Sequence, residues 1–371
     1  MNYILFIFVT LIFLIITAFF ALIPYITRRT ESFGVSIPEE VFNDPDVKKT
    51  RSFYRNLTIF SGLISTSIMI ICLFIFPYSS NQIVLFIIAF ELFVFFAFYL
   101  NANKKMKSLK RKKGWMENKK QFTVVESSFR RNQHLSSPAW FILYFLITAI
   151  TFWIGSIFYN NIPEKVAINY DLNLKPTRLI EKSPLLIAFA PSIQLSVTLL
   201  FIFIYYVISR SKQQIDPAKP EESLQKNKIF RYVWSNFIIF SGLILMLIFM
   251  IMQISFVYPI SPLCLIIIIF IATFSIIVGS IYLSISIGQG GSRIKLSLPA
   301  EKNIVARDDD KYWKLGVFYF NPEDPAVFVE KRFGIGWTCN WARPVSWIIV
   351  TFLLFLILAI VIFSFKLEGK K

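Results

Sequence analysis

Glu91 is the residue whose type and position most directly indicate chemistry in this sequence. It is the ninth of the 18 residues in the apolar stretch Ile83 to Leu100, so it lies near the middle of a helix long enough to span a membrane. An ionised acid at that depth costs roughly 2.5 to 3.5 kcal/mol, so we expect Glu91 to face other helices and to be neutral or partnered. Ser61 and Ser65 lie four residues apart on one helical face and complete the predicted intramembrane polar site.

Two roles for Glu91 stay open at this point. It binds a proton or a cation, or acts as a polar switch, or else it makes a buried structural hydrogen bond. Further candidate partners lie on the same stretch as the two serines and on two later stretches: Thr66, Ser67, Gln194 and Gln253. The sequence does not choose among them.

The remaining polar motifs do not assemble into a catalytic or metal site. Consecutive acids such as Asp308 to Asp310 point in different directions, so we expect a helix cap or a solvated turn there. Residues 288–291, Gly-Gln-Gly-Gly, lack the Lys-Ser/Thr ending of a phosphate-binding loop, and we expect a flexible exit from an apolar stretch. We predict no enzyme activity, no cofactor and no metal site, because the only histidine and cysteines are His134, Cys72, Cys264 and Cys339.

The elements that must position these residues are membrane helices. Of the 371 residues, 56% are hydrophobic and 41 are phenylalanine, while only 16% are charged, which indicates a bilayer as the solvent. The predicted fold class is all-α integral membrane with eight transmembrane helices. The eight stretches long enough to cross roughly 30 Å of hydrocarbon are Tyr3 to Ile26, Leu57 to Tyr78, Ile83 to Leu100, Ala139 to Tyr159, Leu185 to Ile208, Phe237 to Tyr258, Leu263 to Leu283 and Trp347 to Phe365.

The eight stretches fall into two related halves. Residues 59–64 and 239–244 both have the sequence Ile-Phe-Ser-Gly-Leu-Ile, and the same offset of 180 pairs Arg51 with Arg231. We therefore predict a duplicated 4+4 bundle. Its first four-helix repeat covers 1–159, an extracellular loop domain covers 160–183, and the second repeat covers 184–371 with a β-rich cytoplasmic segment at 307–341. Ile271 occupies the position that Glu91 has in the first half.

The distribution of basic residues predicts the orientation. The loops after the first, third, fifth and seventh stretches carry 32 of the 39 Lys and Arg residues, and the opposite side carries seven. Since basic residues near span ends stay in the cytoplasm, we predict a multi-pass cell-membrane protein with both termini extracellular. The net charge of +17 then reflects topology and attraction to anionic lipids of the inner leaflet, and we predict no nucleic-acid partner.

The segment that joins the two halves carries a family resemblance. It contains Ile162-Pro163-Glu164, then Ile168-Asn169-Tyr170-Asp171, then Pro176, and then Lys182-Ser183 at the start of a new helix. This order resembles a loop domain of unknown function in the membrane immunity proteins that protect producer bacteria from the sporulation-delaying killing toxin. The resemblance implies an extracellular peptide partner. The alternation of side chains predicts a short strand followed by a proline turn, which serves either as a structural cap or as a contact surface through Pro163, Asn169, Tyr170, Asp171 and Pro176.

The last cytoplasmic loop carries a second resemblance. From Arg307 to Trp341 it is similar to a small C-terminal domain of unknown function that accompanies the loop domain in Gram-positive membrane proteins. Three β-rich runs predict a three-stranded meander: Trp313 to Phe320, Ala326 to Phe333 and Gly336 to Trp341. So small a sheet needs a surface to cover one face. We expect its aromatic residues to pack on the membrane interface or to bind a cytoplasmic protein partner, namely Tyr312, Trp313, Phe333, Trp337 and Trp341.

Two functions of different classes are consistent with these features. The first, implied by the resemblance, is an immunity or signal-transducing, envelope-sensing membrane protein with a partner-binding cytoplasmic loop. The second is a small transporter or channel with a polar site around Glu91. A water-accessible cavity at Glu91 would favour transport, whereas a dry, serine-rich seam would favour a scaffold or receptor.

Overall fold

The computed structural model describes residues 3–76, 80–116, 120–122, 135–170, 174–258, 260–296, 304–306 and 308–366. It is 71% helical. Seven of its helices are long and apolar enough to cross a membrane, counted over the described residues, which confirms the membrane class. The eight longest helices are α1 (Tyr3–Ile26), α2 (Pro45–Ile75), α3 (Ser80–Lys113), α4 (Phe141–Ile157), α5 (Leu185–Arg210), α6 (Pro220–Val257), α7 (Pro262–Ile287) and α8 (Pro344–Lys366). In α8 the described apolar stretch is the shorter Pro344–Phe355, so the eighth span stays a prediction.

Proline sets the start of several helices. Pro45, Pro220 and Pro262 occupy the first positions of α2, α6 and α7, where the missing N–H is not needed and the fixed φ suits a helix. Asp44 caps α2 by accepting a hydrogen bond from the Asp46 N–H at 2.8 Å. As a result α2 and α6 begin well before the predicted apolar stretches and extend beyond them at the basic end.

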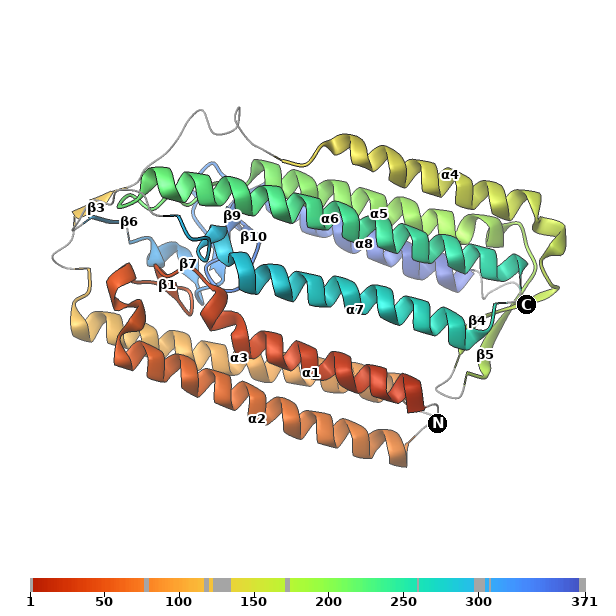
Figure 1. Cartoon of the computed structure of the whole chain (residues 1–371), viewed down its shortest axis with the longest axis horizontal. Coiled ribbons are helices and arrows are strands. Elements are labelled where there is room, and N and C mark those ends of the chain that lie inside the picture. The colour runs from red at the N-terminus through yellow and green to blue at the C-terminus, as the bar shows by residue number, and fades with distance from the viewer. Residues whose placement is uncertain are drawn as a thin grey trace.

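The helices form two groups joined by α7 (Figure 1). In one group α2 packs against both α1 and α3, and in the other α4, α5 and α6 pack against one another, while α7 contacts α6 and α1. The predicted first repeat assigns α4 to the same half as α1, α2 and α3. In space α4 lies against α5 and α6, because Phe141 and Tyr144 pack with Phe201, Ile239 and Met246.

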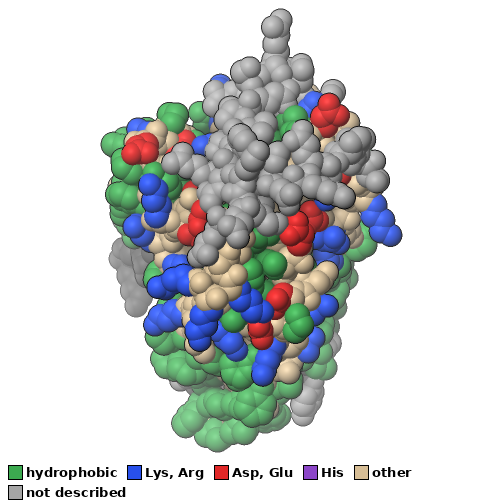
Figure 2. Space-filling view, turned by 90° about the vertical axis from the view of Figure 1, so that its left-hand side faces the viewer, with side chains coloured by type: hydrophobic (Ala, Val, Ile, Leu, Met, Phe, Trp, Pro, Cys, Tyr) green, Lys and Arg blue, Asp and Glu red, His purple; other side chains and the backbone are tan. Residues whose placement is uncertain are grey.

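Short strands lie at the two ends of the bundle (Figure 1). The antiparallel hairpin of β4 (Lys165–Tyr170) and β5 (Pro176–Glu181) lies at the end where α1 begins and α8 ends. The opposite end is rich in basic residues, and Figure 2 shows Lys and Arg side chains gathered on it with Asp and Glu among them. We call it the basic end. Its strands are β1 (Glu31–Ser32), β2 (Val35–Ser36), β3 (Lys120–Phe122), β6 (Ile304–Ala306), β7 (Trp313–Lys314), β8 (Phe318–Tyr319), β9 (Phe328–Glu330) and β10 (Trp337–Cys339).

The segment 308–341 forms two separate hairpins where we predicted a three-stranded meander. β7 pairs only with β8, and β9 pairs with β10. The first predicted strand folds back on itself because Leu315 and Gly316 have φ values of 53° and 76°, a left-handed conformation that turns the chain. Single bridges join the hairpins to each other through Tyr319 and Asn340, and to the α5 end through Lys212 and Val329.

Candidate functional site

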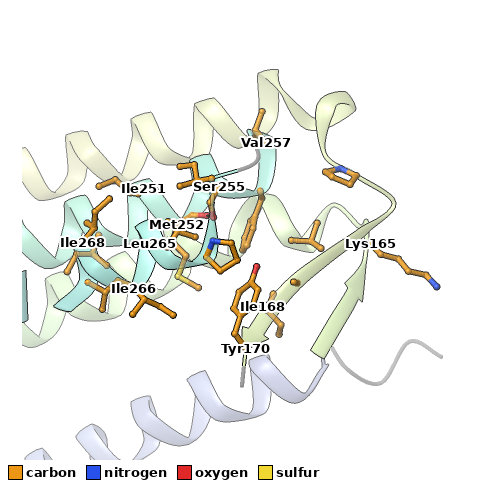
Figure 3. A pocket seen from close by; sticks show the side chains of 18 of the residues that line it. Lys165, Ile168, Tyr170, Ile251, Met252, Ser255, Val257, Leu265, Ile266 and Ile268 are labelled. Atoms are coloured by element: carbon orange, nitrogen blue, oxygen red, sulfur yellow. Dashed lines mark hydrogen bonds between the residues drawn. The ribbon is translucent and has the colours of Figure 1, made fainter. Parts of the chain in front are cut away.

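A cavity lies beneath the β4–β5 hairpin (Figure 3). Its volume is about 430 Å³, which is within the range of ligand-binding pockets in proteins. One wall is β4, and the other walls are the adjoining ends of α6 and α7. We call it the outer pocket; the residues that line it are Asn161, Pro163, Lys165, Val166, Ala167, Ile168, Tyr170, Ile248, Ile251, Met252, Ser255, Phe256, Val257, Ile260, Pro262, Leu265, Ile266, Ile268 and Ile269.

The hairpin is held over the pocket by its own apolar side chains. Ile162 and Val166 are buried and pack with Leu186, Phe256 and Val257 at the ends of α5 and α6. Val166, Ala167, Ile168 and Tyr170 of β4 all line the pocket, and the β4–β5 pairing shifts register between Ala167 and Tyr170. The local pattern that predicts the strand therefore also creates one wall of the pocket.

The chemistry of the outer pocket is that of an apolar binding site. Tyr170 directs its ring into the pocket, whereas the Lys165 side chain points away from it (Figure 3). The Ser255 hydroxyl donates to the Met252 carbonyl oxygen at 2.7 Å, so its proton is already used within the helix. An apolar ligand with one hydrogen-bonding group fits such walls, because a single phenol fixes orientation while isoleucine and leucine supply contact area.

The structure places the predicted extracellular contact residues differently. Pro163 and Tyr170 line the outer pocket, and Pro176 is exposed at the start of β5, paired with Tyr170. Asn169 lies in β4, where its backbone pairs with that of Arg178. Asp171 lies outside the described residues. Sequence reasoning predicted a strand at β4 but missed its partner β5 and the α6 and α7 walls, because the isoleucines of these walls resemble any other lipid-facing residues.

Glu91 joins α3 to α2 in a dry seam. Its side chain is only 2% exposed. The Ser61 hydroxyl donates to its Oε1 at 2.9 Å, and the Ser65 hydroxyl donates to its Oε2. The cavity beside it measures about 10 Å³, which holds no more than about one water molecule. The structure thus brings the three residues of the predicted polar site together beside this small cavity.

The other candidate partners of Glu91 bond elsewhere. Thr66 donates to the Gly62 carbonyl at 2.6 Å, which is a bond within α2. Gln194 donates to the Met246 carbonyl at 2.9 Å and to the Thr151 hydroxyl at 3.0 Å, so it joins α5 to α6 and α4. Each helix group therefore has its own buried polar contacts.

A third polar assembly lies at the basic end and was missed by sequence reasoning. Buried and partly buried charged side chains from five parts of the chain meet there. We call it the ion cluster; its members are Arg28, Glu31, Lys110, Arg231, Asp309, Asp310, Glu330 and Arg332.

Arg332 is the centre of one side of the ion cluster. Its guanidinium pairs with both Asp309 and Asp310 and donates to the Gly34 carbonyl at 3.2 Å. Asp310 also accepts from the Ser36 N–H at 3.0 Å and pairs with Lys110 of α3 at 2.6 Å. These bonds fix segment 308–341 to the β1–β2 hairpin and to α3.

Glu330 is the centre of the other side. It is fully buried and pairs with Arg28, and it lies 3.4 Å from the guanidinium of Arg231. Asn227 donates to it at 2.7 Å. Since Arg231 also donates to the carbonyls of Ile208 and Ser211, this side ties the first loop and segment 308–341 to the end of α5 and to α6.

Burial and neighbouring charges shift the pKa values in the ion cluster in opposite directions. Burial raises the pKa of Glu31 to about 7, although Arg28 and Arg332 oppose the shift. Burial also lowers the pKa of Arg28. For Arg332 the charges of Asp309, Asp310 and Glu31 outweigh burial, so its pKa is raised. The pKa of Asp310 is lowered, because Arg332 and Lys110 outweigh the effect of its burial.

One prediction about loops at this end was confirmed in part and another was wrong. Asp308 caps a turn as predicted, accepting from the Asp310 N–H at 3.2 Å, and Asp309 and Asp310 in addition form ion pairs with Arg332. Residues 288–291 are not a flexible exit. Gln289 is buried and exchanges hydrogen bonds of 2.9 and 2.7 Å with the backbone of Gly336, which fixes α7 to segment 308–341.

The predicted cytoplasmic interaction residues all contact side chains of their own chain. Trp313 is buried with Tyr319 and Val329. The rings of Phe333 and Tyr99 lie 4.3 Å apart, those of Trp337 and Phe230 lie 5.4 Å apart, and those of Trp341 and Trp347 lie 5.1 Å apart. The Tyr312 hydroxyl lies 3.1 Å from a Glu323 carboxylate oxygen. These aromatic residues dock segment 308–341 on the ends of α2, α3, α6 and α8.

Comparison with known proteins identifies one segment of the chain. Residues 322–347 match the model of DUF5808, a family of unknown function. The match covers β9, β10 and the start of α8, and so includes Glu330 and Arg332 of the ion cluster. No curated protein matches the chain, and no solved structure matches it. Among the described residues, no group of His, Cys, Asp and Glu side chains is arranged to hold a metal ion.

Proposed function

We propose that the chain is a multi-pass protein of the cell membrane, without enzyme activity, that binds a hydrophobic peptide at its outer face in an immunity or envelope-sensing role. The observation that carries this proposal is the outer pocket, which is apolar, of ligand-binding size, and walled by a hairpin. That hairpin contains the residues on which the resemblance to immunity proteins rests. The dry seam at Glu91 is the arrangement expected for a receptor, and it offers a transported ion little space.

The membrane topology is part of the same proposal. Eight spans with both termini outside would place the β4–β5 hairpin outside and the ion cluster in the cytoplasm, next to anionic lipid. The start of α1 and the end of α8 lie at the same end of the bundle (Figure 1), which supports an even number of spans. Labelling of Lys175→Cys from outside, and of Ser108→Cys only after permeabilisation, would be the expected result. The reverse pattern would overturn the orientation.

The paired arginines of the two sequence halves support the proposed duplication. Arg51 donates to the Phe42 carbonyl and lies over the Tyr25 ring, so it anchors α2 to the loop from α1. Arg231 binds the carbonyls of Ile208 and Ser211 and anchors α6 to the end of α5. The arginines at matching positions in the two halves therefore both anchor a long helix to the segment that precedes it.

A cytoplasmic protein partner has an exposed apolar surface available to it. Leu315, Phe318 and Phe320 lie around the β7–β8 turn and are 49%, 43% and 45% exposed. Exposed apolar groups at such a turn provide contact area for another protein. We include this partner in the proposal, and no nucleic acid.

Filling the outer pocket tests the proposal. Ile266→Trp would occupy the cavity from the α7 side. Ile271→Trp is the matched control, because Ile271 is on the same helix, 60% exposed, and not part of the pocket wall. The readout is survival of a sensitive bacterium exposed to the sporulation-delaying toxin while it expresses each chain. We expect the parent and the control to protect, and Ile266→Trp to lose at least tenfold in protection.

Two outcomes would contradict the proposal in different ways. If Ile266→Trp protects as well as the parent, the outer pocket is not the peptide site. If the parent itself gives no protection although it is inserted in the membrane, the immunity role is removed. Binding of a fluorescently labelled toxin peptide to the purified parent, compared with both variants, separates lost recognition from poor expression.

A further inference from the structure

Two identical segments of the chain have different surroundings. Residues 59–64 in α2 and 239–244 in α6 have the same sequence. In α6, Ile239 is fully buried and Leu243 packs in the same apolar cluster. In α2, the corresponding Ile59 and Leu63 are 39% and 53% exposed. The same side chains are therefore covered in one half and uncovered in the other.

The element that covers the α6 segment is α4. The Tyr144 hydroxyl donates to the Ile239 carbonyl at 2.7 Å, and the rings of Trp140 and Phe240 lie 5.8 Å apart. Every third or fourth residue of α4 is buried, namely Phe141, Tyr144, Thr148, Thr151 and Gly155. The last helix of the first half thus crosses to the second half and packs on it.

The helix at the matching place in the second half is α8. Its described side chains are mostly exposed or half-buried. Pro344 begins α8 as Pro138 precedes α4. Among the described side chains of α8 only Ser346 is buried. Exposure to lipid alone does not require a partner, because lipid tails are as apolar as isoleucine. A partner helix is indicated because α2 exposes the same residues that α6 uses to pack against a helix.

We propose that α8 of a second copy covers the Ile59 and Leu63 face of α2, and that the exchange is reciprocal in a two-fold dimer. Within one chain, α7 and α1 lie between α8 and α2 in the view of Figure 1. A two-fold arrangement places both copies of α8 on both copies of α2 and closes the assembly. Aligning Pro344 with Pro138 gives Leu354 the position of Thr148, four residues after Tyr144, just as Leu243 lies four residues after the Ile239 that Tyr144 contacts. The offset of 180 then places Leu354 opposite Leu63. We rest this on the proposed duplication and not on the receptor role.

Disulfide cross-linking between two tagged chains tests the dimer. The three native cysteines are first replaced by alanine. One chain then carries Leu63→Cys and the other, with a different tag, carries Leu354→Cys, and both are expressed together and oxidised in membranes. We expect a linked species that contains both tags. The matched control replaces Leu63→Cys by Leu243→Cys, at the identical position of α6 that α4 already covers, and should give no linked species.

The proposal is overturned if no linked species contains both tags. It is also overturned if a chain that carries both Leu63→Cys and Leu354→Cys forms a disulfide only within itself. Light scattering of the purified parent in mild detergent provides a measurement that needs no cysteine variant. Two chains per particle are expected, and one chain per particle at every detergent concentration would also overturn the dimer.

Discussion

The Glu91 seam and the ion cluster are two buried polar sites in which acidic groups are stabilised in different ways. Glu91 accepts hydrogen bonds from two neutral hydroxyls, Ser61 and Ser65, within adjacent helices. The ion cluster brings together charges from the first loop, α3, α6 and segment 308–341. Neutral donors suffice for one acid in a membrane, whereas a group of buried charges is stable only when every member keeps its partner. The seam should therefore tolerate substitution, and the ion cluster should not.

Removing Arg332 should have the largest effect. Arg332→Met removes the guanidinium that pairs with both Asp309 and Asp310, so that only Lys110 remains as a cation beside Asp310. Loss of one partner from a buried group of charges costs about 3 to 5 kcal/mol. Thermal unfolding in detergent measures it. Arg29→Met is the control, because Arg29 is 60% exposed in its pair with Glu39 and such pairs contribute about 1 kcal/mol or less. Equal losses from the two variants would show that the ion cluster is not the stabilising unit.

Glu31 should make the stability of the ion cluster depend on pH. Because its pKa is raised to about 7, the folded protein binds this proton more tightly than the unfolded chain does, and stability falls as pH rises from about 4.5 to about 7. Glu31→Gln removes that dependence. The stability of the variant relative to the parent should therefore rise across this window, by on the order of 1 to 3 kcal/mol, and stay level above it.

The measurement is thermal unfolding of both proteins at pH 5, 6, 7 and 8. Glu39→Gln serves as the control for removal of a carboxylate from a partly exposed position, since the Glu39 side chain is 36% exposed. A difference between Glu31→Gln and the parent that is constant with pH, or that falls as pH rises, would contradict the raised pKa.

Glu91→Gln should have the smallest effect on stability. The amide accepts from one serine and donates to the other, so we expect a loss of about 1 kcal/mol or less. Glu91→Ile, which copies the residue at Ile271, leaves two hydroxyls without their acceptor and should lose about 1 to 3 kcal/mol. If protection against the toxin falls with Glu91→Gln while thermal stability does not, Glu91 has a role beyond packing. If both variants keep full protection, that role is excluded.

The sequence predicts what depends on near neighbours. Hydropathy located the helices, and the spacing of Ser61 and Ser65 placed both among the candidate partners of Glu91, because both features are set within one or two adjacent helices. Helix starts were placed too late in α2 and α6, since amphipathic turns and proline caps outside the membrane extend them. The strand β4 was predicted from alternation, but the pocket beneath it depends on how the hairpin lies over α6 and α7.

The ion cluster escaped prediction because its members are far apart in the chain. Arg332 and Gly34 are separated by 298 positions, and no local pattern connects them. Asp308 to Asp310 resembled a solvated acidic run, since their cations come from α3 and from the next hairpin. The only hint was the pairing of Arg231 with Arg51, which marked two arginines as part of the fold before any partner was known.

The separation in sequence between Arg28 and its partner Glu330 also determines when the ion cluster can form during synthesis. At about 5 to 20 residues per second, a ribosome needs roughly 15 to 60 s to synthesise the chain between them. During that interval Arg28 has Glu31 beside it but not yet Glu330. A chain that stops before the final hairpin never closes the cluster.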